Sequence, residues 1–178
     1  MVDEKFRMDY YRMTGEKWKV LQGLKQMMGS PALRFLFYSR HRGNVFCKIL
    51  KRRIKNRNGL EFELDNIGAG FYLGHPYNIT INRDAVIGKC CNLHKGVTIG
   101  QESRGVRKGS PVIGNKVWIG INAVIVGKII IGDDVLIAPN SYVNRDVPSH
   151  SIVLGNPCRI IPCEDATREY IRREIGLS

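Results

Sequence analysis

The chain has 178 residues, of which 43% are hydrophobic, and it carries a formal net charge of +12. This length allows one main hydrophobic core, and no apolar run approaches the roughly eighteen residues that would cross a bilayer. The first twelve residues are too charged for a secretory signal, and five irregularly spaced cysteines suit neither a disulfide framework nor a metal site, so we expect a soluble, cytoplasmic protein.

Residues 1–58 are predicted to form a helical region. Thr14 is the expected N-cap of a helix over residues 16–28, whose large apolar side chains recur at helical spacing on one side. Ser30 followed by Pro31 has the form of an N-cap and a first helical position, so the pair predicts the start of another helix. We interpret these short helices as a packing or assembly platform rather than a catalytic unit.

A basic run near the end of this region accounts for much of the net charge. Such a run can be a solvated helix face, or it can rest on an anionic membrane surface. Nucleic acid is disfavoured because no helix-turn-helix, zinc-finger or aromatic RNA-binding pattern accompanies the charge. The run consists of Lys48, Lys51, Arg52, Arg53, Lys55 and Arg57.

Residues 59–161 follow a different rhythm, in which an aliphatic residue recurs every six positions. A helical period of 3.6 cannot keep this register, and two inward positions per six residues predict a solenoid of short parallel strands. Coils stacked about 4.8 Å apart would bury one continuous core. The aliphatic positions are Ile81, Ile87, Leu93 and Ile99, and then, after an interruption, Ile113, Ile119, Ile125, Ile131, Ile137 and Val143.

Residues 162–178 are predicted to close the chain with a helix. Ala166, Tyr170 and Ile171 lie at helical spacing on one side, and Ile175 extends the pattern. We expect this helix to cover the open end of the solenoid, where strand edges would otherwise be exposed.

Four segments give the solenoid a family resemblance. They read LGHPYNITIN, IGKCCNLHKGVTIGQ, ESRGVRKGSP and VLGNPCRII. Together with the hexads they resemble the hexapeptide-repeat acyltransferases, in the branch that contains serine acetyltransferases and the acetyltransferases of exopolysaccharide and capsule synthesis. The resemblance implies a mainly β, left-handed parallel β-helix, a homotrimer, acetyl-CoA as the acyl donor, and no metal.

One irregularity in the repeat surrounds a histidine. The step from Leu73 to Ile81 is eight residues instead of six. If these eight residues count as one expanded hexad, Leu73 stacks on Leu93 of the next coil and His75 lies beside Lys95. The two extra residues should then bulge the corner and tilt the histidine away from a flat sheet.

The resemblance assigns chemistry to this corner. Histidine in the LGH motif corresponds to the family's general base, so we expect His75 to take the proton of an acceptor hydroxyl during direct transfer from acetyl-CoA, without an acyl-enzyme. Imidazole suits this role because it can take up a proton near neutral pH. His94, expected beside Gly74 in the next coil, is a candidate for a supporting role. None of the cysteines has the surroundings of an activated nucleophile.

The resemblance also points to residues that contact coenzyme A and to a flexible basic loop near the active site. The step from Ile99 to Ile113 is fourteen residues, so about eight are extruded, and in the family this loop leans over the active site between subunits. The expected loop cations are Arg104, Arg107 and Lys108. The expected coenzyme A contacts are Ile121, Pro139, Asn144, Arg145 and Arg159, of which the two arginines would pair with phosphate oxygens.

The acceptor is less clearly specified. Serine acetyltransferases carry an acidic residue before the base and an arginine-histidine pair in the loop, whereas this chain has Gly74 and Gly109-Ser110 there. We therefore expect a sugar hydroxyl, in exopolysaccharide, capsule or lipopolysaccharide synthesis, with the basic N-terminal face resting on the inner face of a membrane. The alternatives are a serine O-acetyltransferase of cysteine biosynthesis and a non-catalytic trimeric binding module.

Overall fold

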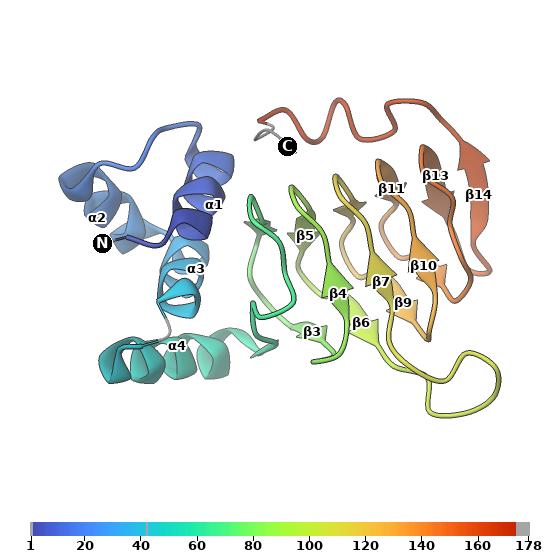
Figure 1. Cartoon of the computed structure of the whole chain (residues 1–178), viewed down its shortest axis with the longest axis horizontal. Coiled ribbons are helices and arrows are strands. Elements are labelled where there is room, and N and C mark those ends of the chain that lie inside the picture. Colours follow the sequence, from blue (N-terminus) through green and yellow to red (C-terminus); the bar gives the residue numbers. More distant parts are fainter. Residues whose placement is uncertain (1, 42, 174–178) are drawn as a thin grey trace.

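The computed structural model describes residues 2–41 and 43–173, which form a cluster of helices at one end of a solenoid (Figure 1). The helices are α1 (Glu4–Thr14), α2 (Val20–Gly29), α3 (Pro31–Arg40) and α4 (Val45–Asn58). Side-chain oxygens of Asp3, Ser30 and Asn44 accept backbone N–H groups at the starts of α1, α3 and α4, which satisfies donors that a helix leaves unpaired. The predicted start of α3 at Pro31 is thereby confirmed.

The predicted start of α2 is wrong. Thr14 is the last residue of α1, which Gly15 terminates in the left-handed conformation with φ 81°. The Thr14 hydroxyl donates to the Tyr10 carbonyl 2.9 Å away, so it serves the end of one helix rather than the start of the next. α2 begins at Val20, and its apolar residue Leu21 is 86% exposed instead of packed.

The solenoid is built from short strands in three sheets. Their orders are β1-β3-β6-β9-β12, β10-β7-β4 and β14-β13-β11-β8-β5-β2, with every pair parallel except β13 with β14. The strands are β1 (Leu60–Glu61), β2 (Tyr72–Gly74), β3 (Ile79–Ile81), β4 (Val86–Ile87), β5 (Asn92–His94), β6 (Thr98–Gly100), β7 (Val112–Ile113), β8 (Trp118–Ile119), β9 (Val124–Val126), β10 (Ile130–Ile131), β11 (Val135–Ile137), β12 (Tyr142–Val143), β13 (Ser151–Leu154) and β14 (Arg159–Pro162).

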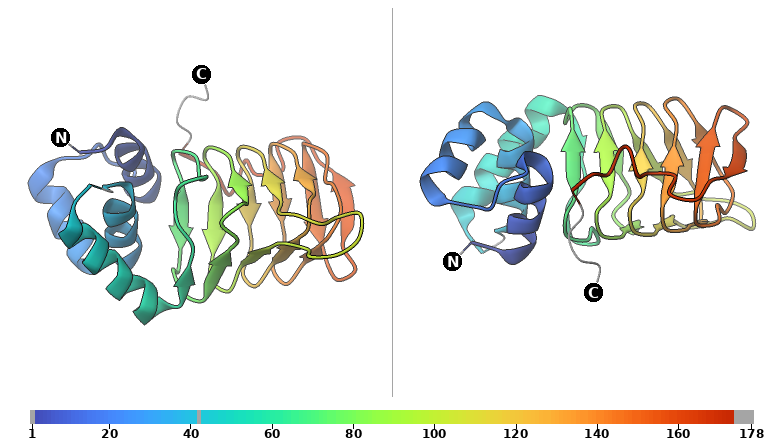
Figure 2. Two further views of the ribbon diagram at one scale, coloured as in Figure 1. Left: turned by 60° about the horizontal axis from the view of Figure 1, so that its bottom comes forward. Right: turned by 90° about the horizontal axis from the view of Figure 1, so that it is seen from above.

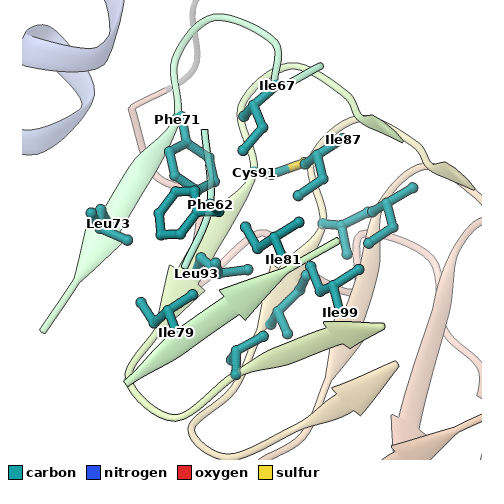
Figure 3. Packing of buried hydrophobic residues seen from close by; sticks show 14 of the residues in the cluster. Phe62, Ile67, Phe71, Leu73, Ile79, Ile81, Ile87, Cys91, Leu93 and Ile99 are labelled. Atoms are coloured by element: carbon teal, nitrogen blue, oxygen red, sulfur yellow. The ribbon is translucent and has the colours of Figure 1, made fainter. Parts of the chain in front are cut away.

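The hexad register predicted from the sequence is confirmed on all three faces. Ile81 pairs with Ile99, which pairs with Ile125, and Ile87 pairs with Ile113 on a second face. On the third face Leu73 pairs with Leu93, as the expanded hexad requires. All the predicted aliphatic positions are buried, and the close view in Figure 3 shows the side chains of the first coils meeting in the interior. Full burial of such a side chain contributes about 1.5–3 kcal/mol, so this row of side chains stabilises the stack.

A buried ion pair fixes the helical region to the first coil. The guanidinium of Arg40 lies 2.9 Å from the Asp9 carboxylate, and both side chains are almost completely buried. Asp9 also accepts the Phe71 backbone N–H at 2.8 Å, while Arg40 donates to the Gly68 carbonyl at 2.7 Å. Because both partners also bond to the backbone of the solenoid, the orientation of α1 and α3 against the first coil is set.

The predicted C-terminal helix is wrong over the residues that the structure describes. Residues 164–170 form successive turns, and the remainder of the prediction, residues 174–178, lies outside the described residues. The Asp134 carboxylate explains the difference, since it accepts the backbone N–H groups of Ala166 and Thr167, both at 3.0 Å, and the Thr167 hydroxyl at 2.6 Å. These bonds hold the segment against the solenoid, and the views of Figure 2 show it running back toward the helices.

The open end of the solenoid is covered by a strand instead. β14 pairs antiparallel with β13 and ends the sheet. Among residues 2–41 and 43–173 we find no helix with the length and apolar character needed to span a bilayer. The expected contact between the basic face and a membrane stays a prediction.

Candidate active site

The eight-residue step builds an expanded corner with His75 at its start. β2 ends at Gly74, and both His75 and Asn78 adopt the left-handed conformation with φ 53°. The Tyr77 N–H donates to the His75 carbonyl at 2.8 Å, and the Tyr77 carbonyl accepts the Gly96 N–H of the next coil at 3.0 Å. The predicted bulge is therefore present, and the side chain of His75 is exposed at the surface.

His94 lies in the neighbouring coil with its ring held in one orientation. Its Nδ1 atom is 2.9 Å from the Ile119 carbonyl oxygen, which can only accept, so Nδ1 carries the proton in the neutral ring and Nε2 is left as an acceptor. The ring centroid lies 4.7 Å from that of Trp118. Burial lowers the pKa of His94, and the charge of nearby His75 lowers it further, although the hydrogen bond to Ile119 works in the other direction. His94 is thus a neutral neighbour of the corner.

Gly74 is matched to the position of His94. The two residues are directly paired between β2 and β5, as the expanded hexad predicted. A Cβ atom on Gly74 would lie 2.8 Å from Cδ2 and 3.0 Å from Nε2 of His94, closer than real contacts of this kind. A side chain at residue 74 would therefore require the His94 ring to move or the strand to shift.

A pocket of about 290 Å³ opens beside His75, between the helical region and the first coil. One wall is the turn that joins α2 to α3, and the other is the end of β2 with the expanded corner. Its lining residues are Met13, Gly29, Ser30, Pro31, Ala32, Tyr72, Leu73, Gly74, His75, Pro76 and Tyr77. Spacing along the chain could not reveal the helical wall, because it comes from a distant segment.

A second pocket, of about 380 Å³, lies on the other side of Tyr72 and contains His94. Arg12 reaches into it from α1, is buried, and donates to the side chain of Asn92 and to the Gly70 carbonyl. We did not predict from the sequence that Arg12, Tyr72, Asn92 and Trp118 would gather around His94. A signal was available, because Tyr72, Asn92 and Trp118 each precede an inward aliphatic residue and are paired in one row.

Three of the five residues expected to contact coenzyme A lie along the corner that begins at His75. Ile121 and Pro139 follow β8 and β11, and the Ile121 carbonyl accepts the Asn140 N–H at 2.9 Å. Arg159 is paired with Leu154 at the end of β13, in the same row. Three strand steps separate His75 from Pro139, which is about 14 Å at 4.7–4.9 Å a step. An extended pantetheine arm could follow this edge.

Asn144, Arg145 and the extruded loop lie at a different corner. Asn144 and Arg145 follow β12, whereas the loop leaves after β6 in the same sheet and extends along the later coils (Figure 2). The loop is tied there by the Lys128 N–H, which donates to the Arg107 carbonyl at 2.9 Å. Arg104 and Lys108 are exposed, as is Arg107. One chain alone does not bring these residues to His75.

Neither cysteine beside the site has the character of a nucleophile. Cys91 points into the core, and burial raises the pKa of its thiol to about 12. Cys90 is buried as well. Within the described part of the chain, no group of three or more histidine, cysteine, aspartate or glutamate side chains could hold a metal ion.

Comparison with known proteins agrees with this architecture. The family model for the bacterial transferase hexapeptide (six repeats) matches residues 110–145. Serine acetyltransferase 2 of Arabidopsis thaliana is 33% identical over 141 residues, which cover 70% of this chain and 44% of that protein. Serine acetyltransferase of Synechococcus elongatus is 37% identical over 95 residues, covering 53% and 39%.

A solved structure is also similar. The serine acetyltransferase of Neisseria gonorrhoeae in complex with serine superposes with a TM-score of 0.63 at 26% identity, covering 89% of this chain and 66% of that one. The chain thus spans about two fifths of the length of the two sequence relatives. The repeat, the parallel coils and these similarities together show that the chain belongs to the hexapeptide-repeat acyltransferase family.

Proposed function

We propose that the chain is an acetyl-CoA-dependent O-acetyltransferase with His75 as the general base. The observation that carries this proposal is the position of His75, which projects from an expanded corner, borders a pocket, and stands at one end of the edge where Ile121, Pro139 and Arg159 follow. The proposed base therefore lies next to a pocket for the acceptor and next to the solenoid edge along which the donor would bind.

The reaction follows from these parts. The neutral imidazole of His75 accepts the proton of the acceptor hydroxyl while its oxygen attacks the thioester carbonyl carbon. The tetrahedral intermediate then expels the coenzyme A thiolate, which takes the proton back from the His75 imidazolium. The acetyl group stays on the acceptor oxygen as an ester, and His75 is neutral again. The neutral, partly buried ring of His94 supports this step because it adds no positive charge beside His75 that would oppose proton uptake.

The donor would be held mainly at the later coils. Arg159 and Arg145 would pair with phosphate oxygens of coenzyme A, and the backbone at Ile121 and Pro139 would border the pantetheine arm. Asn144 and Arg145 lie one corner away from His75 in their own chain. A homotrimer, in which the loop edge of one subunit faces the His75 edge of the next, would bring Arg104, Arg107 and Lys108 over the site. Val106 at the tip of that loop is fully exposed, which fits a contact with a second subunit.

L-Serine is the first acceptor to consider, because the relatives named above are serine acetyltransferases. The sugar acceptor that we expected from the sequence has no support in these comparisons. It is kept as a second candidate on one observation, the close approach of Gly74 to the His94 ring, which an acidic group placed at residue 74 to hold the amino group of serine would have to displace.

The experiment is an acetyl-CoA thiol-release assay in which the purified chain receives serine and a panel of monosaccharides and nucleotide sugars separately. Serine turnover that saturates and yields O-acetylserine would support the first acceptor. Turnover with a sugar and none with serine would replace it. If acetyl-CoA neither binds nor is consumed with any acceptor, the enzymatic proposal is wrong and the binding-module alternative stands.

A further inference from the structure

A groove of about 540 Å³ runs between α3 and α4, next to the pocket of His75. Its residues come from one face of each helix, at spacings of three, four and seven positions. The expanded corner adds one tyrosine. The groove is lined by Pro31, Arg34 and Tyr38 of α3, by Leu50, Arg53, Ile54, Arg57 and Asn58 of α4, and by Tyr77.

The groove is strongly basic, since three arginines and no acidic side chain are among the described residues that line it. Neighbouring lysines on α4 face elsewhere, because Lys51 and Lys55 both pair with Glu63, at 2.6 and 2.7 Å. No such ion pair is present for Arg53 or Arg57 in the described part of the chain, and both are exposed. Their charges are available to an incoming anion.

Arg34 lines the groove and is held in place by two backbone carbonyls. Its Nη1 atom donates to the carbonyl oxygens of Met27 and Met28 at 2.8 and 2.5 Å, which fixes the guanidinium and leaves other N–H groups of the fork for a ligand. The N-terminus of α3 and the C-terminus of α4 both border the groove, so their dipole ends oppose each other. The guanidinium charges therefore decide the sign of the potential.

An independent observation points to a ligand with oxygen acceptors. Asn58 is only 5% exposed, and its side-chain Nδ2 has no hydrogen-bond partner among the described residues. Buried donors are almost always paired, so one left unpaired in the wall of a basic groove is unusual. Because Nδ2 itself is buried, the side-chain amide must turn toward the groove before an oxygen of a ligand can accept from it.

Aromatic side chains suggest what the rest of the ligand looks like. Tyr38 and Tyr77 line the groove together with the apolar Leu50 and Ile54, which suits a sugar or base ring. Tyr77 and Pro31 also line the pocket beside His75, so the two cavities adjoin. A ligand seated in the groove could extend toward the histidine.

We infer that the groove between α3 and α4 is a binding site for a phosphate or pyrophosphate group carried by a small, ring-bearing molecule. Arg53, Arg57 and Arg34 would bind the phosphate oxygens, and Asn58 would donate one further hydrogen bond once its amide turns toward the groove. This binding goes beyond acetyl transfer and does not depend on it, so the two can fail separately.

The test is calorimetric titration of the full chain with inorganic pyrophosphate and with UDP-glucose. Arg53→Gln and Arg57→Gln should each weaken pyrophosphate binding about tenfold, the effect of losing one charge-assisted hydrogen bond. Arg52→Gln is the matched control, because Arg52 is exposed on the same helix but does not line the groove, and it should change binding by less than about twofold. UDP-glucose should bind more tightly than pyrophosphate if the tyrosines cover its ring.

Two further arms identify the source of the phosphate. Saturating coenzyme A should leave pyrophosphate binding intact, and the double variant Arg145→Gln with Arg159→Gln should bind pyrophosphate as wild type does. If coenzyme A displaces pyrophosphate and the double variant binds it more weakly, pyrophosphate occupies the coenzyme A site and the inference is overturned. Vesicles containing phosphatidylglycerol should compete with pyrophosphate only if a lipid headgroup is the natural source, in which case their binding depends on Arg53 and Arg57. Equal binding by wild type, Arg52→Gln, Arg53→Gln and Arg57→Gln, or no saturable binding, would also overturn it.

Discussion

Replacement of Gly74 by alanine tests the geometry of the candidate site. The new Cβ atom would lie 2.8 Å from Cδ2 of His94, so the ring must move or the strand must shift. The ring is held by its hydrogen bond to the Ile119 carbonyl and by contact with Trp118. Overpacking of this kind costs about 1–3 kcal/mol, and loss of the hydrogen bond alone costs about 1 kcal/mol. We expect Gly74→Ala to lower the free energy of unfolding by about 1–3 kcal/mol.

A double-mutant cycle with His94→Ala isolates the clash. Once the imidazole is absent, the two closest contacts of the Cβ atom are gone, and the next one is Tyr72 Cε1 at 3.2 Å. Gly74→Ala should then cost less than about 0.5 kcal/mol in the His94→Ala background, which leaves a coupling energy of about 1–2 kcal/mol. Urea unfolding at one fixed protein concentration measures all four variants, because assembly would otherwise change the apparent stability.

If Gly74→Ala costs the same in both backgrounds, residue 74 does not clash with His94. An equal cost would mean that the alanine acts on the backbone or on a different neighbour, and that His94 does not exclude side chains at residue 74. Gly74 would then give no reason to keep a sugar as a candidate acceptor. The thiol-release assay on Gly74→Asp with His94→Ala gives the converse test, since an acid that finds room should lower KM for serine.

Three other changes probe separate parts of the structure. Burial lowers the pKa of His94, so below about pH 6.5 the unfolded chain binds more protons than the folded chain. The free energy of unfolding should therefore fall as the pH drops below about 6.5. His94→Gln should reduce this pH dependence in unfolding curves taken from about pH 7.5 to 5. Burial alone would raise the pKa of Asp134, but hydrogen bonds from Thr167, His150 and Ala166 outweigh this effect and lower that pKa. Asp134→Asn should therefore destabilise the fold by about 1–3 kcal/mol above pH 5 and speed amide exchange in the C-terminal turns. An unchanged exchange rate in these turns would contradict the anchoring role of Asp134. Replacing Arg104, Arg107 and Lys108 together by glutamine should raise KM about tenfold or more without changing the melting temperature, and unchanged kinetics would show that the loop does not reach the site.

The repeat could be predicted from the sequence because a coil of three hexads leaves little freedom. Each aliphatic start, such as Ile99 or Ile125, must stack on its counterpart, and a fourteen-residue step can only extrude a loop. The same counting placed Leu73 on Leu93 and Gly74 on His94. Local capping signals were reliable where the side chain bonds within its own turn, as Ser30 does with the Leu33 N–H.

Features that depend on distant partners could not be predicted this way. The C-terminal segment has helical spacing, but its amides bond to Asp134, more than thirty residues earlier, instead of to one another. Thr14 resembles an N-cap, yet Gly15 makes it the end of a helix. The pocket beside His75 requires the turn before Pro31, whose docking depends on the buried pair of Asp9 and Arg40.

The role of His75 as general base is tested by comparing His75→Asn with wild type in the thiol-release assay, alongside calorimetric titration with acetyl-CoA. His75 is exposed at the rim of a pocket, so the asparagine should preserve the fold and the affinity for acetyl-CoA. Loss of a general base should lower kcat about 10²–10⁴-fold with the true acceptor. Near-wild-type turnover by His75→Asn would contradict the account, because the expanded corner would then present a histidine that takes no part in the reaction.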